Sequence, residues 1–124
     1  MNLHIRILPN ELAVCRLAPE APLPSWVRGA FTSVTRTRHE LSIVCNDDAV
    51  PPAINAERNW RAFMVEGPIP FEMTGVAAAL IAPLAGAHIS VFLIATFDTD
   101  YLMVKSEKFE EASEILRAAG HEVT

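Results

Sequence analysis

Two aspartates, Asp98 and Asp100, stand one residue apart between two apolar runs of the sequence. A carboxylate in such a place can bind an ammonium group or a basic side chain through a charge-assisted hydrogen bond. Aspartate is also common in tight turns, where its side chain hydrogen-bonds the neighbouring backbone. A divalent metal site needs more oxygen ligands than this pair offers, and the sequence places no third acid beside it. Amine binding and turn formation therefore remain as interpretations, with Asp100 the first candidate for a ligand contact.

The other side chains capable of chemistry are scattered along the chain. His4, His39, His88 and His121 form no pair at helical or metal-ligand spacing. The sequence contains no Gly-x-Ser-x-Gly elbow, glycine-rich phosphate loop, Cys-His pair or dinucleotide fingerprint. Because the sequence brings no nucleophile and base together, we expect a protein that is not an enzyme, with no catalytic residue, no metal and no cofactor.

Composition limits the kind of protein and the kind of partner. The 124 residues are 51% hydrophobic, which suits one compact unit or two small units with a shared core and excludes a disordered chain. The net charge of -5 and the lack of a Lys or Arg run argue against nucleic-acid and anionic-membrane partners. No signal-like segment opens the chain, and no apolar segment reaches the ~18 residues of a membrane span. We therefore expect a soluble, cytoplasmic protein, with Cys15 and Cys45 as reduced core thiols.

The first half of the chain is predicted to be mostly β-strand. Residues 3–8 and 12–17 flank a Pro-Asn turn signal and predict a hairpin, and residues 31–46 predict a second hairpin. A short helix is expected over residues 24–29, because a serine cap opens this segment and a glycine stop ends it. Residues 46–59 contain paired prolines and are the expected linker.

The second half is predicted to alternate strands and helices. The helices are indicated by a threonine cap, good helix formers and an apolar repeat of helical period, and the strands by apolar runs. In order, the predicted elements are a strand at 60–67, a helix from 74 to 85, strands at 88–96 and 101–105, a helix at 107–119 and a last strand at 121–124. This β-α-β-β-α-β order is typical of a ferredoxin-like α+β sandwich.

The loop before the first of these helices is a candidate anion site. A helix start presents unpaired backbone N–H groups and a partial positive charge, so the N–H groups from Thr74 to Val76 can hold the carboxylate of an amino acid. The alternative is an ordinary helix end capped by water. Gly67 and Gly75 either let the backbone approach a ligand closely or only accommodate unusual dihedral angles.

The stretch "GPIPFEMTGVAAALIAPLAGAHISVFLIATFDTDYLMVK" resembles an ACT domain, the small-molecule-sensing module attached to enzymes of amino-acid metabolism such as aspartokinases. Within it, "TGVAAALIAPLAGAHISV" is similar to the ACT pattern in which Gly-Val opens the first helix and Ala-x-Ile-x-Val starts the second strand. The segments "GPIPF" and "FDTDYLMV" resemble free-standing two-ACT proteins related to aspartokinase regulatory domains and CASTOR-type arginine sensors. The resemblance implies an ACT domain at residues 60–124 in tandem with a degenerate, β-rich ACT-like subdomain at 1–59.

The resemblance also implies a ligand site. ACT domains generally bind ligands between two ACT units, with the loop before the first helix and the end of the second strand, which here are residues 66–76 and 96–100. Related sensors carry an acidic residue in the turn just before the helix; the nearest acid here is Glu72, and Met73 follows it. The ligand-binding residues expected from this match are Gly67, Pro68, Phe71, Glu72, Met73, Thr74, Gly75, Val76, Thr96, Phe97, Asp98 and Asp100.

Two functions from different classes follow from this resemblance. The first is a regulatory protein that binds a small molecule, foremost an amino acid, and thereby changes its association with itself or with a protein partner. The alternative is an ACT-fold structural or interaction module that no longer binds a ligand. A homodimer is expected, because sheets of this kind leave an open edge that a second copy commonly covers.

Overall fold

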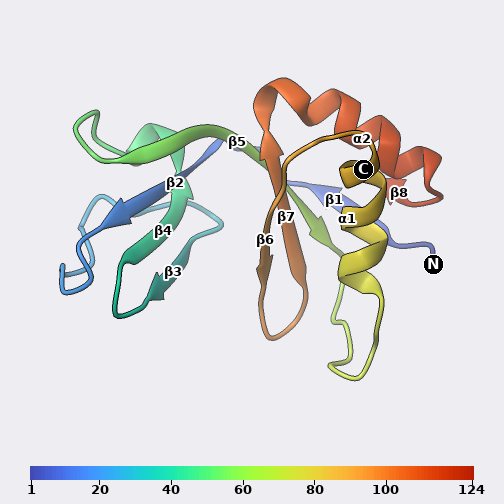
Figure 1. The fold of residues 1–124 in the computed structure, drawn as a ribbon, viewed down its shortest axis with the longest axis horizontal. Coiled ribbons are helices and arrows are strands. Elements are labelled where there is room, and N and C mark those ends of the chain that lie inside the picture. The colour runs from blue at the N-terminus through green and yellow to red at the C-terminus, as the bar shows by residue number, and fades with distance from the viewer. The chain divides into compact units, whose positions relative to one another are not determined.

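The computed structural model describes all residues from Met1 to Thr124. The chain forms eight β-strands, two α-helices and two short 3₁₀ turns (Figure 1). It divides into two compact units. The helical unit contains Met1–Pro9 and Arg61–Thr124, and the strand unit contains Asn10–Trp60. Residues 1–9 thus belong with the second half of the chain, whereas the sequence predicted that they belong with residues 10–59.

The strand unit is an antiparallel sheet around a small apolar core. In sheet order its strands are β3 (Ser33–Arg36), β4 (Leu41–Asn46), β2 (Leu12–Leu17) and the first half of β5 (Ala56–Val65). Because side chains alternate between the two faces of a strand, every second residue of β2 and β4 reaches this core. Its buried members are Ala13, Cys15, Leu41, Ile43, Cys45 and Val50.

Predictions for the first half of the chain had mixed outcomes. The hairpin over residues 31–46 is confirmed as β3 and β4. The prediction of a hairpin over residues 3–17 is wrong, because β1 (His4–Ile7) pairs with β5 and β8 and not with β2. The short helix over residues 24–29 is also wrong. One turn-type hydrogen bond, from the Val27 N–H to the Pro24 carbonyl at 3.4 Å, does not offset the entropic cost of starting a helix.

The predicted linker over residues 46–59 is a folded segment held by Arg58. Its guanidinium forms an ion pair with Asp47, with 3.0 Å between Nη1 and Oδ1. Its Nη2 donates to the backbone carbonyls of Val50 at 3.1 Å and Pro51 at 2.9 Å. Its Nη1 also donates to the Asp47 carbonyl at 3.3 Å. The planar guanidinium offers several donors in a fixed geometry, so one side chain satisfies four acceptors and orders the loop. The linker prediction is therefore wrong.

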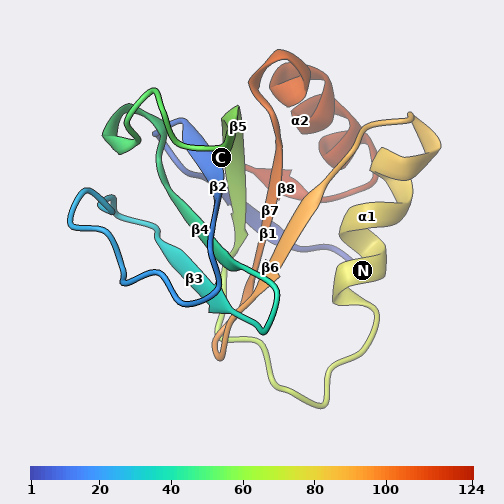
Figure 2. The ribbon, with the colours of Figure 1, turned by 60° about the vertical axis from the view of Figure 1, so that its left-hand side comes forward.

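The helical unit is a sheet with both α-helices on one face (Figure 2). In sheet order its strands are β6 (Phe92–Ala95), β7 (Asp100–Lys105), the second half of β5, β1 and β8 (Glu122–Val123). The helices are α1 (Val76–Gly86) and α2 (Phe109–Ala118), the latter preceded by a 3₁₀ turn at Ser106–Lys108. The predicted β-α-β-β-α-β order is confirmed for β5 to β8, and with it the ferredoxin-like α+β fold. β1 is an additional strand between β5 and β8, antiparallel to the first and parallel to the second.

The core of the helical unit lies between its sheet and its helices. The rings of Phe63 and Phe109 stack with their centroids 5.0 Å apart, and the Arg61 guanidinium lies 4.3 Å from the Phe109 centroid. Burial of aliphatic side chains is the main stabilising term for such a layer. The aliphatic core residues with no exposed surface are Ile5, Leu80, Leu84, Leu102, Val104, Ala112 and Leu116.

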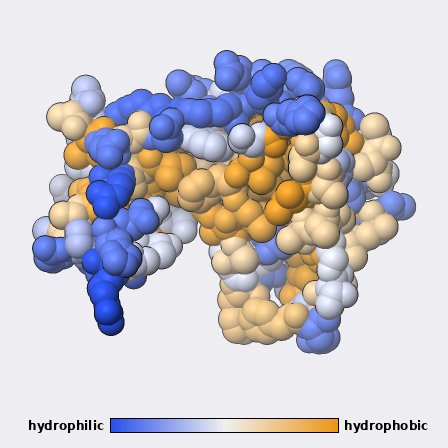
Figure 3. Space-filling model, in the orientation of Figure 1, coloured by the Kyte–Doolittle hydropathy of each residue, from blue (hydrophilic) through white to orange (hydrophobic).

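The two helices differ in polarity. α2 has an apolar face toward the core and charged residues outside, as predicted, and Figure 3 shows hydrophilic residues over it. α1 has no polar side chain. It begins after Gly75, whose φ of 84° is left-handed, and no side chain caps it, so the predicted Thr74 cap is wrong. It continues through Pro83 to Gly86. Neither helix has the length and apolar content of a membrane span.

The buried thiols of the strand unit are predicted to make stability fall in alkaline solution. Burial raises the pKa of Cys15 from 9.0 to about 11 and raises the pKa of Cys45 as well. Above pH 9 an unfolded thiol ionises while folded Cys15 stays protonated, so the free energy of unfolding decreases as the pH rises toward 11. We expect Cys15 to contribute a loss of about 1 kcal/mol between pH 8 and 10, measured by urea unfolding. Cys15→Ala should flatten this dependence, and an unchanged slope would contradict the assignment.

Candidate functional site

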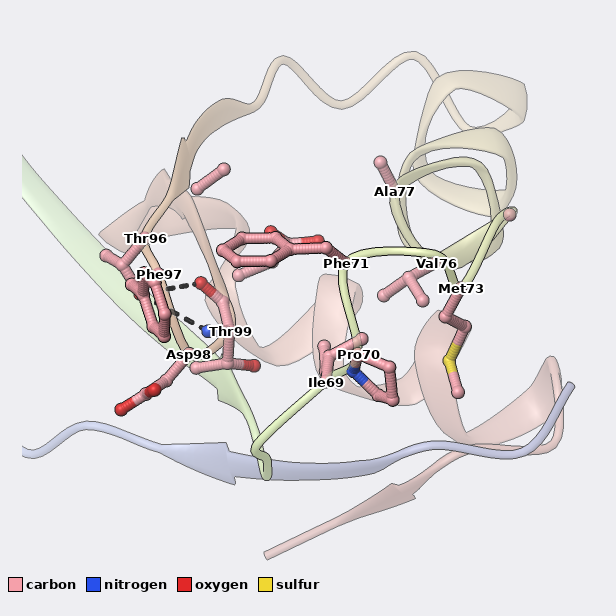
Figure 4. Close-up of a pocket in the computed structure, with 13 residues that line it drawn as sticks. Ile69, Pro70, Phe71, Met73, Val76, Ala77, Thr96, Phe97, Asp98 and Thr99 are labelled. Carbon is pink, nitrogen blue, oxygen red and sulfur yellow. Dashed lines mark hydrogen bonds between the residues drawn. The ribbon is translucent and has the colours of Figure 1, made fainter.

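A pocket of about 300 Å³ lies in the helical unit between the loop that precedes α1 and the turn that joins β6 to β7 (Figure 4). Figure 3 shows a hollow in this region that is bordered mainly by hydrophobic atoms. This volume is at the lower end of the range for small-molecule sites. The lining residues are Ile69, Pro70, Phe71, Met73, Gly75, Val76, Ala77, Ala95, Thr96, Phe97, Asp98, Thr99 and Asp100.

Two threonines close the β6–β7 turn. The Thr96 N–H and its Oγ1 hydroxyl both donate to the Thr99 carbonyl at 2.9 Å, and the Thr99 N–H donates to Thr96 Oγ1 at 3.3 Å. The buried Thr99 hydroxyl donates to the Val65 carbonyl at 2.6 Å, which ties the turn to β5. No residue of the turn has a positive φ, so an Asn-Gly pair is not required.

Asp98 and Asp100 leave their carboxylates free of protein partners. Neither side chain has a hydrogen bond or an ion pair with any other part of the chain, although Asp98 is exposed and Asp100 is half-buried. In Figure 4 the Asp98 carboxylate points away from the ring of Phe71, toward the outside of the pocket. The threonine hydroxyls, and not the aspartate side chains, form the hydrogen bonds that close the turn. Both carboxylates therefore remain available to a ligand.

The loop before α1 is fixed to the turn through its backbone. The Ile69 N–H donates to the Asp98 carbonyl at 2.7 Å. A Cβ on Gly67 would lie 3.1 Å from that carbonyl oxygen and 3.2 Å from the Thr99 Cβ, so this close approach favours glycine. Gly75 has a φ of 84°, which strains any residue with a side chain. The backbone geometry therefore explains why glycine occupies both positions, without any role for a ligand.

The start of α1 presents unpaired donors to the pocket. The first intrahelical bond runs from the Ala79 N–H to the Gly75 carbonyl at 2.9 Å, so the N–H groups of Val76, Ala77 and Ala78 have no acceptor in the protein. Val76 and Ala77 line the pocket, and the first turn contains no acidic residue. The partial positive charge of this helix end is therefore not neutralised by the chain itself.

Two phenylalanines form the apolar rim of the pocket. The rings of Phe71 and Phe97 meet edge to face with centroids 4.9 Å apart. They are 73% and 79% exposed, and Met73, which also lines the pocket, is 47% exposed. Large apolar side chains that cluster while exposed indicate a contact surface for a ligand or a partner. Figure 4 shows Phe71 and Phe97 next to each other on the turn side of the pocket.

The pocket brings together most of the predicted site residues. Those that line it are Phe71, Met73, Gly75, Val76, Thr96, Phe97, Asp98 and Asp100. The predicted residues outside the lining are Gly67, Pro68, Glu72 and Thr74. Ile69, Pro70 and Thr99 also line the pocket; they lie in the segments 66–76 and 96–100 expected to bind the ligand, although they were not named among the contacts. Ala77 and Ala95 line it from outside those segments. Ala77 and Ala95 carried no signal, because a small apolar residue in a helix or strand has no chemical signature.

The charged groups of the pocket are all acidic. No Lys, Arg or His belongs to its lining, and Asp98 and Asp100 are its only ionisable residues. No group of three or more His, Cys, Asp or Glu side chains anywhere in the protein is placed to hold a metal ion. The arrangement can therefore receive a cationic group at the turn and an anionic group at the start of α1, with apolar contacts between them.

Comparison with known families identifies the fold. The family model described as "ACT domain" matches residues 55–118, and a second family model, described as an N-terminal domain, matches residues 10–53. The chain belongs to the ACT domain family. The resemblance noted in the sequence is thereby confirmed.

Two related sequences are similar to most of the chain. The human putative protein CASTOR3P is 31% identical over 112 residues, which are 77% of this chain and 69% of that protein. The bovine "Cytosolic arginine sensor for mTORC1 subunit 1" is 29% identical over 96 residues, which are 68% of this chain and 29% of the sensor. The chain thus spans less than a third of the length of that sensor.

Two solved structures show the same fold. A crystal structure of a protein from Agobacterium tumefaciens superposes with a TM-score of 0.94 at 35% identity, covering 100% of this chain and 93% of that one. The ligand-free regulatory subunit of aspartate kinase from Thermus thermophilus superposes with a TM-score of 0.66 at 11% identity, covering 96% and 99%. The second likeness concerns the fold alone.

The threonine turn gives a testable prediction about stability. Thr99→Val removes the buried hydroxyl and leaves the Val65 carbonyl without its donor, so the free energy of unfolding should fall by about 1–2 kcal/mol. Asp98→Asn, the matched control in the same turn, should change it by less than about 0.5 kcal/mol, because that carboxylate has no partner. Urea unfolding measures both. A loss for Asp98→Asn as large as that for Thr99→Val would show that the turn depends on the carboxylate.

Proposed function

We propose that this ACT protein binds a free amino acid in the pocket between the β6–β7 turn and the start of α1. The observation that carries the proposal is that one pocket is lined both by Asp100, whose carboxylate has no partner in the protein, and by Val76 and Ala77, whose backbone N–H groups are unpaired. An α-amino acid carries an ammonium and a carboxylate a short distance apart, and each matches one of these groups in charge and hydrogen-bonding type.

Arginine is the first candidate among the amino acids. One relative is named as a cytosolic arginine sensor, which supports arginine but concerns a protein more than three times as long as the matched segment. The exposed rings of Phe71 and Phe97 offer π-faces to a guanidinium, and Asp98 adds a second carboxylate at the outer border of the same pocket. A cation that contacts an aromatic face and a carboxylate together is bound more tightly than one that contacts either group alone.

The proposed role is regulation rather than catalysis, in the cytoplasm and without a cofactor. Ligand binding would change the association of the chain with itself or with a protein partner, because a ligand shifts any equilibrium between states that bind it differently. The relatives and the aspartate kinase regulatory subunit support a regulatory class of protein. We further propose that residues 10–60 are a degenerate ACT-like subdomain that lacks α-helices.

The free edge of β6 supports a homodimer. β6 pairs only with β7, so its other edge presents backbone donors and acceptors without a neighbouring strand. Ala95 belongs both to β6 and to the pocket lining, so a second copy on this edge would lie beside the ligand. Sedimentation equilibrium should therefore give a mass twice that of the 13.6 kDa chain, with the dimer fraction altered by arginine. A monomer at all concentrations, with and without arginine, would contradict the dimer.

A thermal-shift screen of the twenty amino acids tests the ligand. A ligand present at about 100 times its Kd adds about 2.7 kcal/mol to the free energy of unfolding, which raises the Tm by several degrees. Arginine at millimolar concentration should do so, and few other amino acids should. If none raises the Tm, the protein is not a sensor of free amino acids, and the alternative of a structural or interaction module that binds no ligand stands.

The role of Asp100 is tested by removing its charge. Asp100→Asn should abolish most of the arginine-induced rise in Tm, because the ammonium loses its charged acceptor. Asp48→Asn makes the same change on an exposed acid of the strand unit and should leave the rise intact. A full rise in the Asp100→Asn protein would remove Asp100 from the site.

A further inference from the structure

Pro83 leaves one carbonyl of α1 without its helical partner. In an α-helix the N–H of residue i donates to the carbonyl of residue i−4, and the acceptor for position 83 is Ala79. Proline has no N–H, and its ring also pushes that carbonyl away from the helix axis. α1 nevertheless continues past Pro83 to Gly86. A donor from outside the helix is therefore needed for the Ala79 carbonyl.

The imidazole of His121 supplies that donor. Its Nε2 lies 3.3 Å from the Ala79 carbonyl oxygen, and its Nδ1 accepts the Leu3 N–H at 3.1 Å. His121 is only 5% exposed. A backbone N–H can only donate and a carbonyl can only accept, so the two partners require a neutral ring with its proton on Nε2. Both ring nitrogens are then satisfied.

The backbone around His121 holds the ring in place. The His121 N–H donates to the Leu116 carbonyl at 3.2 Å, at the end of α2. The next residue, Glu122, donates its N–H to the Leu3 carbonyl at 2.9 Å, within the pairing of β1 with β8. The Leu3 N–H thus donates to the imidazole, and the Leu3 carbonyl accepts a hydrogen bond from Glu122 in β8. The ring is fixed to the sheet on one side and reaches α1 on the other.

This contact is a directional link between the middle of α1 and the sheet of the helical unit. The end of α1 also accepts hydrogen bonds from the residues that directly follow it, 87–89. All side chains of α1 are apolar, so its packing on the sheet is otherwise hydrophobic, with no preferred direction, and resists sliding along the helix axis only weakly. A hydrogen bond to one particular carbonyl fixes that position. The first turn of the same helix carries Val76 and Ala77, which line the pocket.

We propose that His121 is a positioning residue for α1: its neutral, Nε2-protonated imidazole replaces the N–H that Pro83 lacks and thereby fixes the helix start that borders the pocket. The structural part of this proposal stands without a ligand, and its effect on binding rests on the proposed function.

The tautomer can be measured on the unmodified protein. ¹⁵N NMR of the imidazole at pH 7.5 should show His121 as Nε2-protonated, with Nδ1 shifted as expected for a hydrogen-bond acceptor. His39, an exposed histidine of the strand unit, serves as the reference ring. The opposite tautomer, or averaging like that of His39, would overturn the proposal. This measurement needs no variant and so does not depend on how any variant folds.

A double-mutant cycle tests the link between His121 and Pro83. His121→Phe should speed hydrogen exchange of the α1 amides by about tenfold, which corresponds to one hydrogen bond of ordinary net strength. Pro83→Ala restores the missing N–H, so the same His121→Phe change should then have less than about a threefold effect on these amides. His121→Gln keeps a donor and an acceptor and should stay close to the wild type. Equal effects of His121→Phe in both backgrounds would contradict the proposal.

The effect on binding is read from arginine titrations of the same proteins. His121→Phe should weaken arginine binding by about tenfold, and adding Pro83→Ala should restore most of it. His39→Phe should leave the affinity unchanged. If the wild type binds no amino acid, the proposed function fails while the tautomer and the exchange cycle still decide the role of His121. Unchanged affinity in the His121→Phe protein would refute its influence on the pocket.

Discussion

The helical unit depends on β1 being hydrogen-bonded along both edges. Ile5 has no exposed surface and pairs with Val65 of β5 on one side and with Val123 of β8 on the other. Without β1 these two strands would face each other across an empty position in the sheet. The strand also sets the location of Leu3, and through it that of the His121 ring. The sheet and the position of the His121 ring, which lies after the end of α2 and contacts α1, therefore both depend on β1.

In the candidate site, one set of polar groups holds the turn and the loop together, and a different set has no partner in the protein. The turn is closed by the hydroxyls of Thr96 and Thr99, and the loop is attached to the turn by the Ile69 N–H. These bonds use backbone carbonyls and leave the carboxylates of Asp98 and Asp100 without protein partners. A carboxylate without a partner costs little only where water or a ligand can reach it, which is the case at this pocket. Neither carboxylate would therefore have to give up a protein partner to contact a ligand.

Much of the helical unit could be predicted from its sequence, because its signals are local. The amphipathic period of α2 and the apolar runs of β6 and β7 identified these elements, and two charges within an apolar stretch marked Asp98 and Asp100. The partners of β1 could not be predicted, since Pro9 and Asn10 signal a turn but not which strand pairs with which. Ile5 meets residues from the middle and the far end of the chain, and such pairing leaves no local pattern.

The order of strands also has a consequence for how the protein is made. β1 is synthesised before the other strands of the two units, and β8, which pairs with it, is synthesised after all of them. During that time the strand unit can fold, since all its residues lie between Asn10 and Trp60. The helical unit cannot complete its sheet, and the apolar strand with Ile5 stays unpaired during this time. Translation itself therefore favours folding of the strand unit before folding of the helical unit.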